Sequence, residues 1–447
     1  MTTGLWVRNM SGPNNGTSKH EFQTQSPTTS AQASIATVAG DDWYQFDMTV
    51  ADYKAGIAWN LLGSASEKPT SCVIAFDLRL STIINNAAPV EAPICSIVRA
   101  SDGLIYGRLA LIAGATNTTR KLKLFGLSGS GSSITTSDLA IDTNYRIEAF
   151  WRGVGDLRMS LRLNGAVVEA SPTYNYLGSI PQPLNSYFLG GNLSGAMGGK
   201  AGNDSDVVAN IKDFAVSIRD DGAGNWIGTA ATVDCIRPNA DTAVEQWTRS
   251  TGADSYALVD ETTPDTADYL TVSNSSADDN KATELDMQSA ATGGVTAPLA
   301  VLMRAHLFPG VTAAASPVDV EIGVDDNGTN STVGIGSTMI ADGVGSMYPQ
   351  TSAALKPFDT RPSNGADWAT ADIDALKFRI LRNTTYDGTN RRAMTLATAK
   401  IDVLDGAVGS ALPADTGSRA RSWGMVMEIV LMLMLLEAVR GGADLFG

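Results

Sequence analysis

Alternation of apolar and polar residues with a period of two recurs along most of the chain, which predicts β-strands with one face buried and one in water. In residues 72–80 the even positions are apolar, and in residues 145–151 the odd positions are apolar. We expect both segments to be strands of a sandwich. The positions predicted to point away from the core are Val73, Ala75, Asp77 and Arg79 in the first segment and Arg146, Glu148 and Arg152 in the second.

Turn signals follow several of these segments. Residues 157–163 alternate in the same way and run into Asn164 and Gly165, the pair that supplies positive φ angles in a tight hairpin. Apolar residues alternate again in 214–218, just before the turn-rich stretch 220–224. We place the end of the first domain in that stretch.

The second half of the chain shows the same pattern with different residues. Strands are predicted in 301–307, 318–324 and 376–380, and the second of these ends in the turn sequence 325–328. Many short strands with glycine and asparagine turns, and little helical periodicity, are typical of antiparallel sandwiches. The sequence therefore predicts an all-β fold with two antiparallel jelly-roll β-sandwich domains.

We divide the chain into four segments. Residues 1–40 are rich in small polar residues and predict an extended N-terminal arm, residues 41–222 the first sandwich, and residues 223–410 the second. Residues 411–447 form a linker and a hydrophobic C-terminal helix.

The C-terminal helix is expected over residues 423–440, where strong helix formers precede two glycines. It is shorter than the roughly 20 apolar residues of a membrane span and carries Glu428 and Glu437. We therefore expect it to pack in an oligomer or against a partner; packing on its own domains and membrane contact are the alternatives. The predicted interface residues are Trp423, Met425, Val426, Ile429, Val430, Met432, Leu433, Leu435, Leu436 and Val439.

Composition excludes nucleic acid as a partner and gives no sign of disulfide or zinc cross-links. The 447 residues are 43 % hydrophobic and carry a net charge of −15, which repels a phosphate backbone and excludes nucleic acid as a partner. Three cysteines without a CxxC spacing indicate neither a disulfide framework nor a zinc cluster. Cys72 is expected to be a small buried residue.

Little in the sequence points to catalysis. The two histidines, His20 and His306, are too few for most histidine-based nucleophile or metal schemes. Glycoside hydrolysis needs two carboxylates, and the nearest approach, residues 319–321 with 325–326, is better explained by a wet strand face and a turn. A hairpin turn also explains residues 325–330 better than a calcium loop does. We therefore expect a protein that is not an enzyme and that has no cofactor.

Part of the sequence resembles a known fold family. Residues 144–149, 161–165, 187–191 and 211–214 resemble the second half of concanavalin A-like (laminin G-like) domains, over most of residues 41–222. The resemblance implies a fold and says little about a ligand. No sugar-binding or calcium-binding residue can be matched to it.

The second half looks like a module of uncharacterised virion proteins of tailed bacteriophages, over roughly residues 230–405. The resemblance implies a structural component of the virion, as capsid decoration or in the neck or tail, made in the host cytoplasm. Other virion proteins, further copies of the chain and a host surface glycan are the implied partners. The matching segments are 247–248, 256–261, 268–270, 358–359 and 368–376.

The alternative is a carbohydrate-active depolymerase or a free glycan-binding lectin. An enzyme should show paired carboxylates inside an aromatic-lined cleft on the concave sheet, whereas a virion scaffold should have its termini buried in other subunits. A core role is favoured for each tryptophan because aromatic residues anchor sandwich cores. The tryptophans considered for sugar stacking are Trp43, Trp59, Trp151, Trp226, Trp247 and Trp368.

Overall fold

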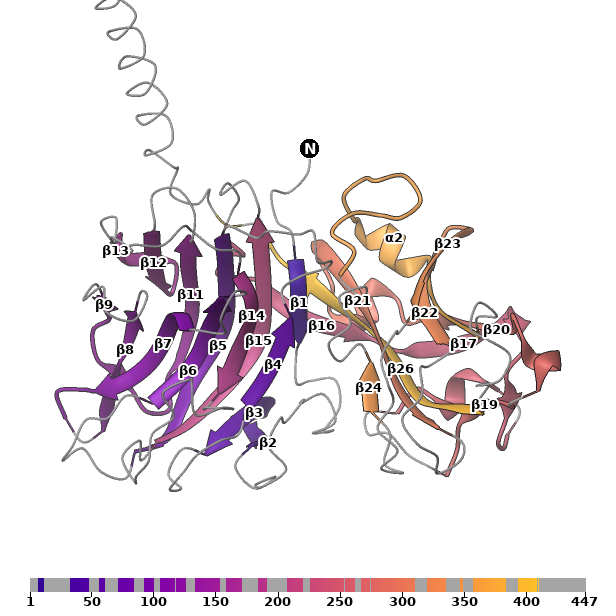
Figure 1. Cartoon of the computed structure of the whole chain (residues 1–447), viewed down its shortest axis with the longest axis horizontal. Coiled ribbons are helices and arrows are strands. Elements are labelled where there is room, and N and C mark those ends of the chain that lie inside the picture. The colour runs from indigo at the N-terminus through magenta and orange to yellow at the C-terminus, as the bar shows by residue number, and fades with distance from the viewer. Residues whose placement is uncertain are drawn as a thin grey trace, which may run out of the picture.

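The structure is a computed structural model of the chain, and Figure 1 shows its strands in two groups side by side. The described residues are 7–11, 33–47, 56–60, 71–83, 92–99, 105–116, 118–125, 133–152, 158–170, 184–190, 207–219, 226–252, 254–261, 267–273, 275–309, 320–334, 346–348, 357–382, 393–407 and 409.

The N-terminal sandwich consists of two antiparallel sheets. Sheet A has the order β13 (Ala166–Ala170), β12 (Arg158–Leu163), β11 (Asn144–Arg152), β5 (Ser71–Ile83), β15 (Val207–Arg219), β3 (Asp41–Asp47) and β2 (Ala33–Val38), with β1 (Val7–Ser11) also paired to β15. Sheet B has the order β10 (Leu139–Ala140), β8 (Thr119–Phe125), β7 (Ile105–Ala113), β6 (Ala92–Arg99), β14 (Leu184–Gly190) and β4 (Gly56–Asn60), with β9 (Ser133–Thr135) paired to β8.

The C-terminal sandwich also consists of two antiparallel sheets. Sheet C has the order β18 (Thr248–Arg249), β19 (Leu270–Val272), β26 (Met394–Asp405), β21 (Pro298–Pro309) and β24 (Ser346–Tyr348), with β16 (Thr232–Ile236) also paired to β26. Sheet D has the order β17 (Pro238–Glu245), β20 (Ala282–Met287), β25 (Leu376–Arg382), β22 (Val320–Asp326) and β23 (Thr329–Gly334). Helices in the described residues are short: α1 (Ala290–Gly293), α2 (Thr370–Asp374) and the 3-10 helices η4 (Tyr256–Leu258) and η5 (Ser276–Asp278).

The predicted all-β class with antiparallel jelly-roll sandwiches is confirmed, and so are the predicted core faces. The alternating apolar residues of β5 and β11, including Cys72, lie in one buried cluster between sheets A and B. In the second sandwich, the inward residues of β21, β22 and β25 share a second buried cluster. Period-two alternation therefore identified which side chains each sandwich buries.

Two predicted hairpin turns are present. Asn164 and Gly165 join β12 to β13 with φ angles of 50° and 83°. Asn327 and Gly328 join β22 to β23 with φ angles of 53° and 85°. Both pairs have positive φ at two consecutive residues, which asparagine followed by glycine adopts at low cost.

The outer face of sheet A packs against the second sandwich. Phe150 of β11 meets Trp226 edge to face, with ring centroids 6.2 Å apart, and both belong to one buried cluster that includes residues of sheet C. The four sheets are therefore stacked in the order B, A, C, D. The residues of this interdomain cluster are Val73, Ala75, Phe150, Ala215, Trp226, Ile227, Ala231, Val233, Leu299, Ala300, Leu302 and Leu404.

This packing corrects the expectation of a wet face on β5 and β11. Val73 and Ala75 are buried in the interdomain cluster. The polar side chains of Arg146, Glu148 and Arg152 are also buried, with exposures of 7 %, 0 % and 1 %. They point away from the core of their own sandwich, as predicted, but the neighbouring sandwich covers them.

The buried Glu148 carboxylate contacts both sandwiches at this junction. The Glu148 carboxylate accepts a hydrogen bond from the backbone N–H of Gly228 at 2.8 Å and lies 3.1 Å from the guanidinium of Arg162. That guanidinium also stands over the Trp226 ring, 5.1 Å from its centroid. Glu148 and Arg162 both belong to sheet A, so the Gly228 hydrogen bond is the contact that crosses the junction, and removing Arg162 would leave a buried charge uncompensated.

The two predicted terminal elements have different outcomes. Within residues 1–40, expected to be an arm, β1 pairs with β15 and β2 pairs with β3, so this segment adds strands to sheet A. Whether it also tethers another subunit stays a prediction. The helix predicted over 423–440, with every predicted interface residue, lies outside the described residues.

Candidate functional site

Five of the six tryptophans considered for sugar stacking have core roles. Trp43 and Trp151 are 0 % exposed, Trp226 is 2 % exposed, Trp247 4 % and Trp368 6 %. The side chain of Trp59 lies outside the described residues. The preference for core roles is therefore confirmed for the five that are described, and none of these five rings offers a face to a sugar.

The acidic residues considered for catalysis or calcium serve structural roles where they are described. Asp326 is 1 % exposed and pairs with the Arg361 guanidinium at 2.7 Å, and Asp325 accepts a hydrogen bond from the backbone N–H of Gly328 at 2.6 Å. Glu321 accepts a hydrogen bond from the Thr332 hydroxyl at 2.6 Å. These contacts hold the β22–β23 hairpin and its surroundings in place.

His306 is buried in β21, while His20 and Asp319 lie outside the described residues. Across the described part of the chain, no cluster of three or more His, Cys, Asp or Glu side chains is arranged to hold a metal ion. No helix there is long and apolar enough to cross a membrane.

The outer face of sheet B carries a cationic set of side chains that the sequence reasoning missed. In β8, Leu122 and Leu124 are 0 % exposed and point into the sandwich core. Because side chains alternate along a strand, Lys121, Lys123 and Phe125 point to the opposite, outer face. All three are partly exposed.

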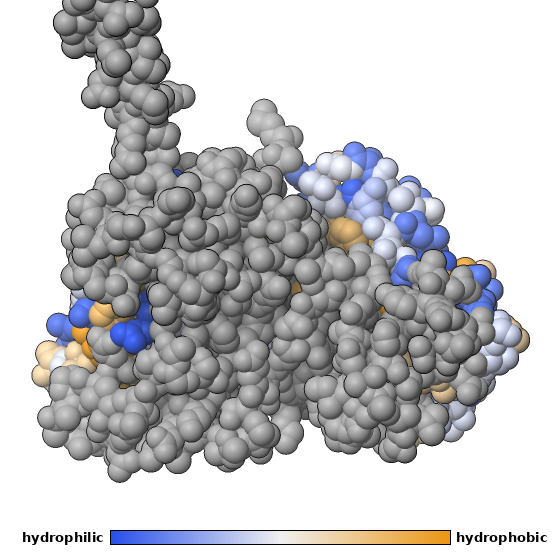
Figure 2. All heavy atoms as spheres, viewed as in Figure 1, coloured by the Kyte–Doolittle hydropathy of each residue, from blue (hydrophilic) through white to orange (hydrophobic). Residues whose placement is uncertain are grey.

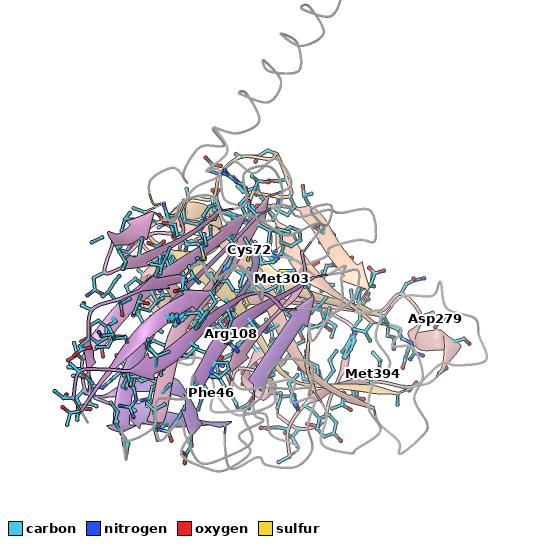
Figure 3. The ribbon with its side chains drawn as sticks, turned by 60° about the vertical axis from the view of Figure 1, so that its left-hand side comes forward. Phe46, Cys72, Arg108, Asp279, Met303 and Met394 are labelled. Atoms are coloured by element: carbon cyan, nitrogen blue, oxygen red, sulfur yellow. The ribbon has the colours of Figure 1, made fainter. Side chains whose placement is uncertain are left out.

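Strand β7 places Arg108 beside the Phe125 ring. Arg108 is the cross-strand neighbour of Phe125, and Ala110, with its small side chain, is the neighbour of Lys123. Figure 3 labels Arg108 in the foreground, on the strands of the N-terminal sandwich. Neither β7 nor β8 contains an acidic residue. We call Arg108, Lys121, Lys123 and Phe125 the cationic face.

Two of these cations, Arg108 and Lys123, lie over the phenyl ring of Phe125. The Arg108 guanidinium carbon lies 4.9 Å from the ring centroid, and the Lys123 ammonium nitrogen lies 4.4 Å from it. Cations are attracted to the electron-rich face of an aromatic ring, each for about 0.5–1 kcal/mol at exposed sites. The ring therefore holds two like charges close together in a chain whose net charge is −15.

Asp138 restrains the third cation. Its carboxylate lies 3.8 Å from the Lys121 ammonium and accepts hydrogen bonds from the backbone N–H of Ala115 at 3.0 Å and from the Thr119 hydroxyl at 3.2 Å. The Lys121 side chain is 36 % exposed, so the pair is accessible to solvent and weakly bound. An anionic ligand can compete for this lysine at low cost.

Polar and apolar atoms lie next to each other at this end of the molecule. Figure 2 shows hydrophilic and hydrophobic residues side by side at the left-hand edge, where Figure 1 places β8 and β9. An aromatic ring beside several cations can contact the apolar face of a sugar while the cations bind its acidic groups. Arginine binds carboxylates and sulfates in a bidentate manner, and lysine binds them as a mobile point charge.

One sequence signal could have revealed this face. Residues 119–125 read Thr-Arg-Lys-Leu-Lys-Leu-Phe, which alternates leucine with lysine and ends on an aromatic residue. Three cations in four positions are unusual in so acidic a chain. The contribution of Arg108 was not predictable in this way, because it depends on the pairing of β7 with β8.

Comparisons with known proteins identify no family for this chain. No protein-family model matches the chain, and none of the curated proteins matches it significantly. Among solved structures, the PL7 alginate lyase AlyA1 from Zobellia galactanivorans is 15 % identical, covering 49 % of this chain and 96 % of its own, with a TM-score of 0.30.

Two further matches have similar scores. The endo-β-1,4-glucuronan lyase from the fungus Trichoderma reesei is 11 % identical over 46 % of this chain and 94 % of its own, with a TM-score of 0.32. The heptameric SAP-like pentraxin from Limulus polyphemus is 15 % identical over 36 % of this chain and 74 % of its own, with a TM-score of 0.25. Two of these three proteins are named as lyases.

The expectation that the chain is not an enzyme is therefore wrong as a sequence-based conclusion, since several matching structures are polysaccharide lyases. The physical reason is that histidine-based schemes and carboxylate pairs are not the only acid–base chemistry open to a protein. Lysine and tyrosine side chains can also transfer protons, so a scarcity of histidines and carboxylate pairs does not exclude catalysis.

Proposed function

We propose that this chain recognises an acidic polysaccharide through the cationic face of sheet B. The observation that supports this proposal is the placement of Arg108 and Lys123 at 4.9 Å and 4.4 Å from the Phe125 ring, with Lys121 further along the same strand. A sugar polymer that bears carboxylate or sulfate groups offers the matching chemistry, apolar ring faces with regularly spaced negative charges.

The stacking of the sheets also favours this face. The outer face of sheet A is covered by the second sandwich, where Val73, Ala75 and Phe150 pack against sheet C. Sheet B lies at the other side of the same sandwich and is not part of that interdomain cluster. A ligand that binds the first sandwich on a sheet face therefore meets sheet B.

Isothermal titration of the full chain with alginate oligosaccharides tests the proposal. We expect Lys123→Ala to weaken binding roughly tenfold, about 1.4 kcal/mol, because it removes one charge and one ring contact. We also expect binding to weaken with added salt, since screened charges attract less. Lys212→Ala is the matched control: this lysine also lies over an aromatic ring, Trp43, at 4.8 Å, but on sheet A.

Two results would contradict the proposal. One is equal affinity of the wild type and Lys123→Ala for the oligosaccharides. The other is equal binding of a neutral glucan, which would leave the charges without a role.

Cleavage of the bound polymer is the second candidate, and the same residues favour it. In such a cleavage a base takes the proton next to the sugar carboxylate, the glycosidic C–O bond breaks, and the leaving oxygen is protonated, so a double bond remains. Cations that neutralise the carboxylate assist the removal of the proton, and Arg108 and Lys123 both lie beside the Phe125 ring. Lyase action creates a double bond, so ultraviolet absorbance should rise during incubation with alginate. Binding without any rise in absorbance would limit the function to recognition.

Location in a tailed-phage particle is a separate proposal. It rests on the resemblance of residues 230–405 to phage virion modules, and assembly through residues 423–440 belongs with it. Light scattering of the full chain and of a variant lacking residues 423–447 tests assembly. Light scattering gives the number of chain copies in each particle. The same number for the full chain and for the truncated variant would contradict a role of this segment in assembly.

A further inference from the structure

Asp213 occupies an unusual position at the junction of the two sandwiches. It lies in β15 at a break in the pairing with β5, between Lys212 and Ala215, and its φ angle is +51°. Such a bulge redirects a side chain out of the regular alternation. The Asp213 carboxyl group accepts a hydrogen bond from the backbone N–H of Val233 in β16, at 2.9 Å. One carboxyl group thus connects sheet A to sheet C.

Arg146 of β11 contacts the same part of the junction. Its guanidinium donates hydrogen bonds to the backbone carbonyl of Asp213 at 3.1 Å and to that of Gly228 at 3.3 Å. It also pairs with the Asp77 carboxylate at 3.2 Å. The arginine therefore holds β5, β15 and the start of the second sandwich together.

The cations near Asp213 pair with other carboxylates. Arg146 is engaged with Asp77, and Lys212 is engaged with Asp41 at 2.8 Å. Asp213 itself is only 5 % exposed. The charges that act on Asp213 are those of Asp77 on β5, Arg146 on β11 and Lys212 on β15. The other described charged residues on the packed elements are Asp41, Asp42 and Asp47 of β3, Arg79 of β5, Glu148 and Arg152 of β11, Arg162 of β12, Asp234 of β16 and Lys400, Asp402 and Asp405 of β26.

Burial raises the pKa of Asp213 to about 6, and the negative charge of Asp77 adds to the rise, while the Val233 N–H, Lys212 and Arg146 oppose it. An ionised carboxylate is therefore poorly accommodated at the docked junction, although a protonated carboxyl group still accepts the hydrogen bond from Val233 through its carbonyl oxygen.

We propose that protonation of Asp213 tightens the docking of the two sandwiches, so that the junction is firm in mildly acidic solution and looser near neutral pH. The sign follows from linkage. A carboxyl group with a pKa of about 6 when docked, and an ordinary value of 3.8 when exposed, binds more protons in the docked state. Its contribution to docking is complete below about pH 4 and is lost as the pH rises through about 6.

The magnitude follows from the same two values. A difference of about two pKa units changes the docking equilibrium by roughly 100-fold between the two ends of this range. The effect does not depend on ligand binding to the cationic face, because Asp213 lies on sheet A and the cationic face on sheet B.

Hydrogen–deuterium exchange of the full chain tests the proposal. After correction for the intrinsic pH dependence of exchange, we expect the amide of Val233 to lose protection by roughly 30-fold between pH 4.5 and pH 7.5, because pH 4.5 already lies within the titration range. The Asp213→Asn variant keeps an acceptor oxygen and carries no charge at this position. In this variant the amide of Val233 should stay protected at both pH values. Asparagine also tolerates the positive φ angle.

A matched control separates this effect from general acid sensitivity. Asp142 also has a positive φ angle, 57°, but its side chain is 62 % exposed and pairs with Arg79. Asp142→Asn should leave the pH profile of Val233 unchanged. Asp77→Asn removes a like charge, so it should move the midpoint of the profile to lower pH.

Two outcomes would overturn the proposal. A wild-type profile without change between pH 4.5 and pH 7.5 would show that docking does not respond to this proton. A profile of Asp213→Asn that follows the wild type would assign the response to another group. Circular dichroism of each variant confirms that the strands are retained before the profiles are compared.

Discussion

Replacing Trp226 with alanine removes the indole that joins the two sandwiches. The ring is 2 % exposed, meets Phe150 edge to face at 6.2 Å, and lies under the Arg162 guanidinium at 5.1 Å. A buried tryptophan covers about 200 Å² of surface, worth about 5 kcal/mol at about 25 cal/mol/Å². Measured Trp→Ala changes in cores cost about 3–5 kcal/mol, which agrees with this area.

We therefore expect the Trp226→Ala variant to lose about 3–5 kcal/mol of unfolding free energy, and its thermal midpoint to fall by about 6–20 °C. Urea titration followed by circular dichroism and scanning calorimetry measures both quantities. Val167→Ala is the control, because Val167 is 54 % exposed and its loss should change stability by less than about 0.5 kcal/mol. A loss below about 1 kcal/mol for Trp226→Ala would refute the reasoning that this ring anchors the junction.

Three further substitutions test other parts of the fold by urea titration. Gly323→Ala should destabilise the β22–β23 hairpin by more than about 1 kcal/mol, because a new Cβ would collide with backbone of β23; an unchanged midpoint would show that the strands can separate without cost. Arg361→Ala should lower the free energy of unfolding by about 3 kcal/mol, because Asp326, which is 1 % exposed, loses the cation 2.7 Å away. An unchanged free energy of unfolding would mean that water replaces the arginine. Hydrogen bonds from Lys281 and Ser273 lower the pKa of Asp278 to about 2, so its contribution to stability is present above about pH 4 and is lost as the pH falls through about 2. Asp278→Asn should therefore destabilise the chain at pH 7 and have no effect near pH 1.5; equal effects at both values would contradict this pairing.

The sequence predicted what each sandwich buries and not what the sandwiches bury against each other. Alternation placed the inward residues of β5 and β11 correctly, because a strand in a two-sheet sandwich has one core face whatever the rest of the chain does. Glu148 and Arg152 were expected in water because charged residues are rarely buried unpaired. Their burial depends on the Gly228 amide and on a sheet more than 70 residues away, which no local pattern contains.

The cationic face was partly predictable. Lys121 and Lys123 alternate with leucines in a single strand, so their outward direction follows from the sequence alone. The distance of Arg108 from Phe125 follows from the register of β7 with β8, which is set by long-range pairing. The five described tryptophans are core residues, as expected, so none of them pointed to this face.

Electrophoresis of the full chain through gels that contain alginate, compared with gels that contain a neutral glucan, tests the proposed recognition most directly. We expect the wild-type chain to be retarded in the gels that contain alginate and not in those that contain the neutral glucan. The triple variant Arg108→Ala, Lys121→Ala, Lys123→Ala should migrate in alginate gels as it does in neutral ones, while Lys212→Ala should stay retarded. Equal retardation of the triple variant and the wild type would contradict binding at the cationic face of sheet B.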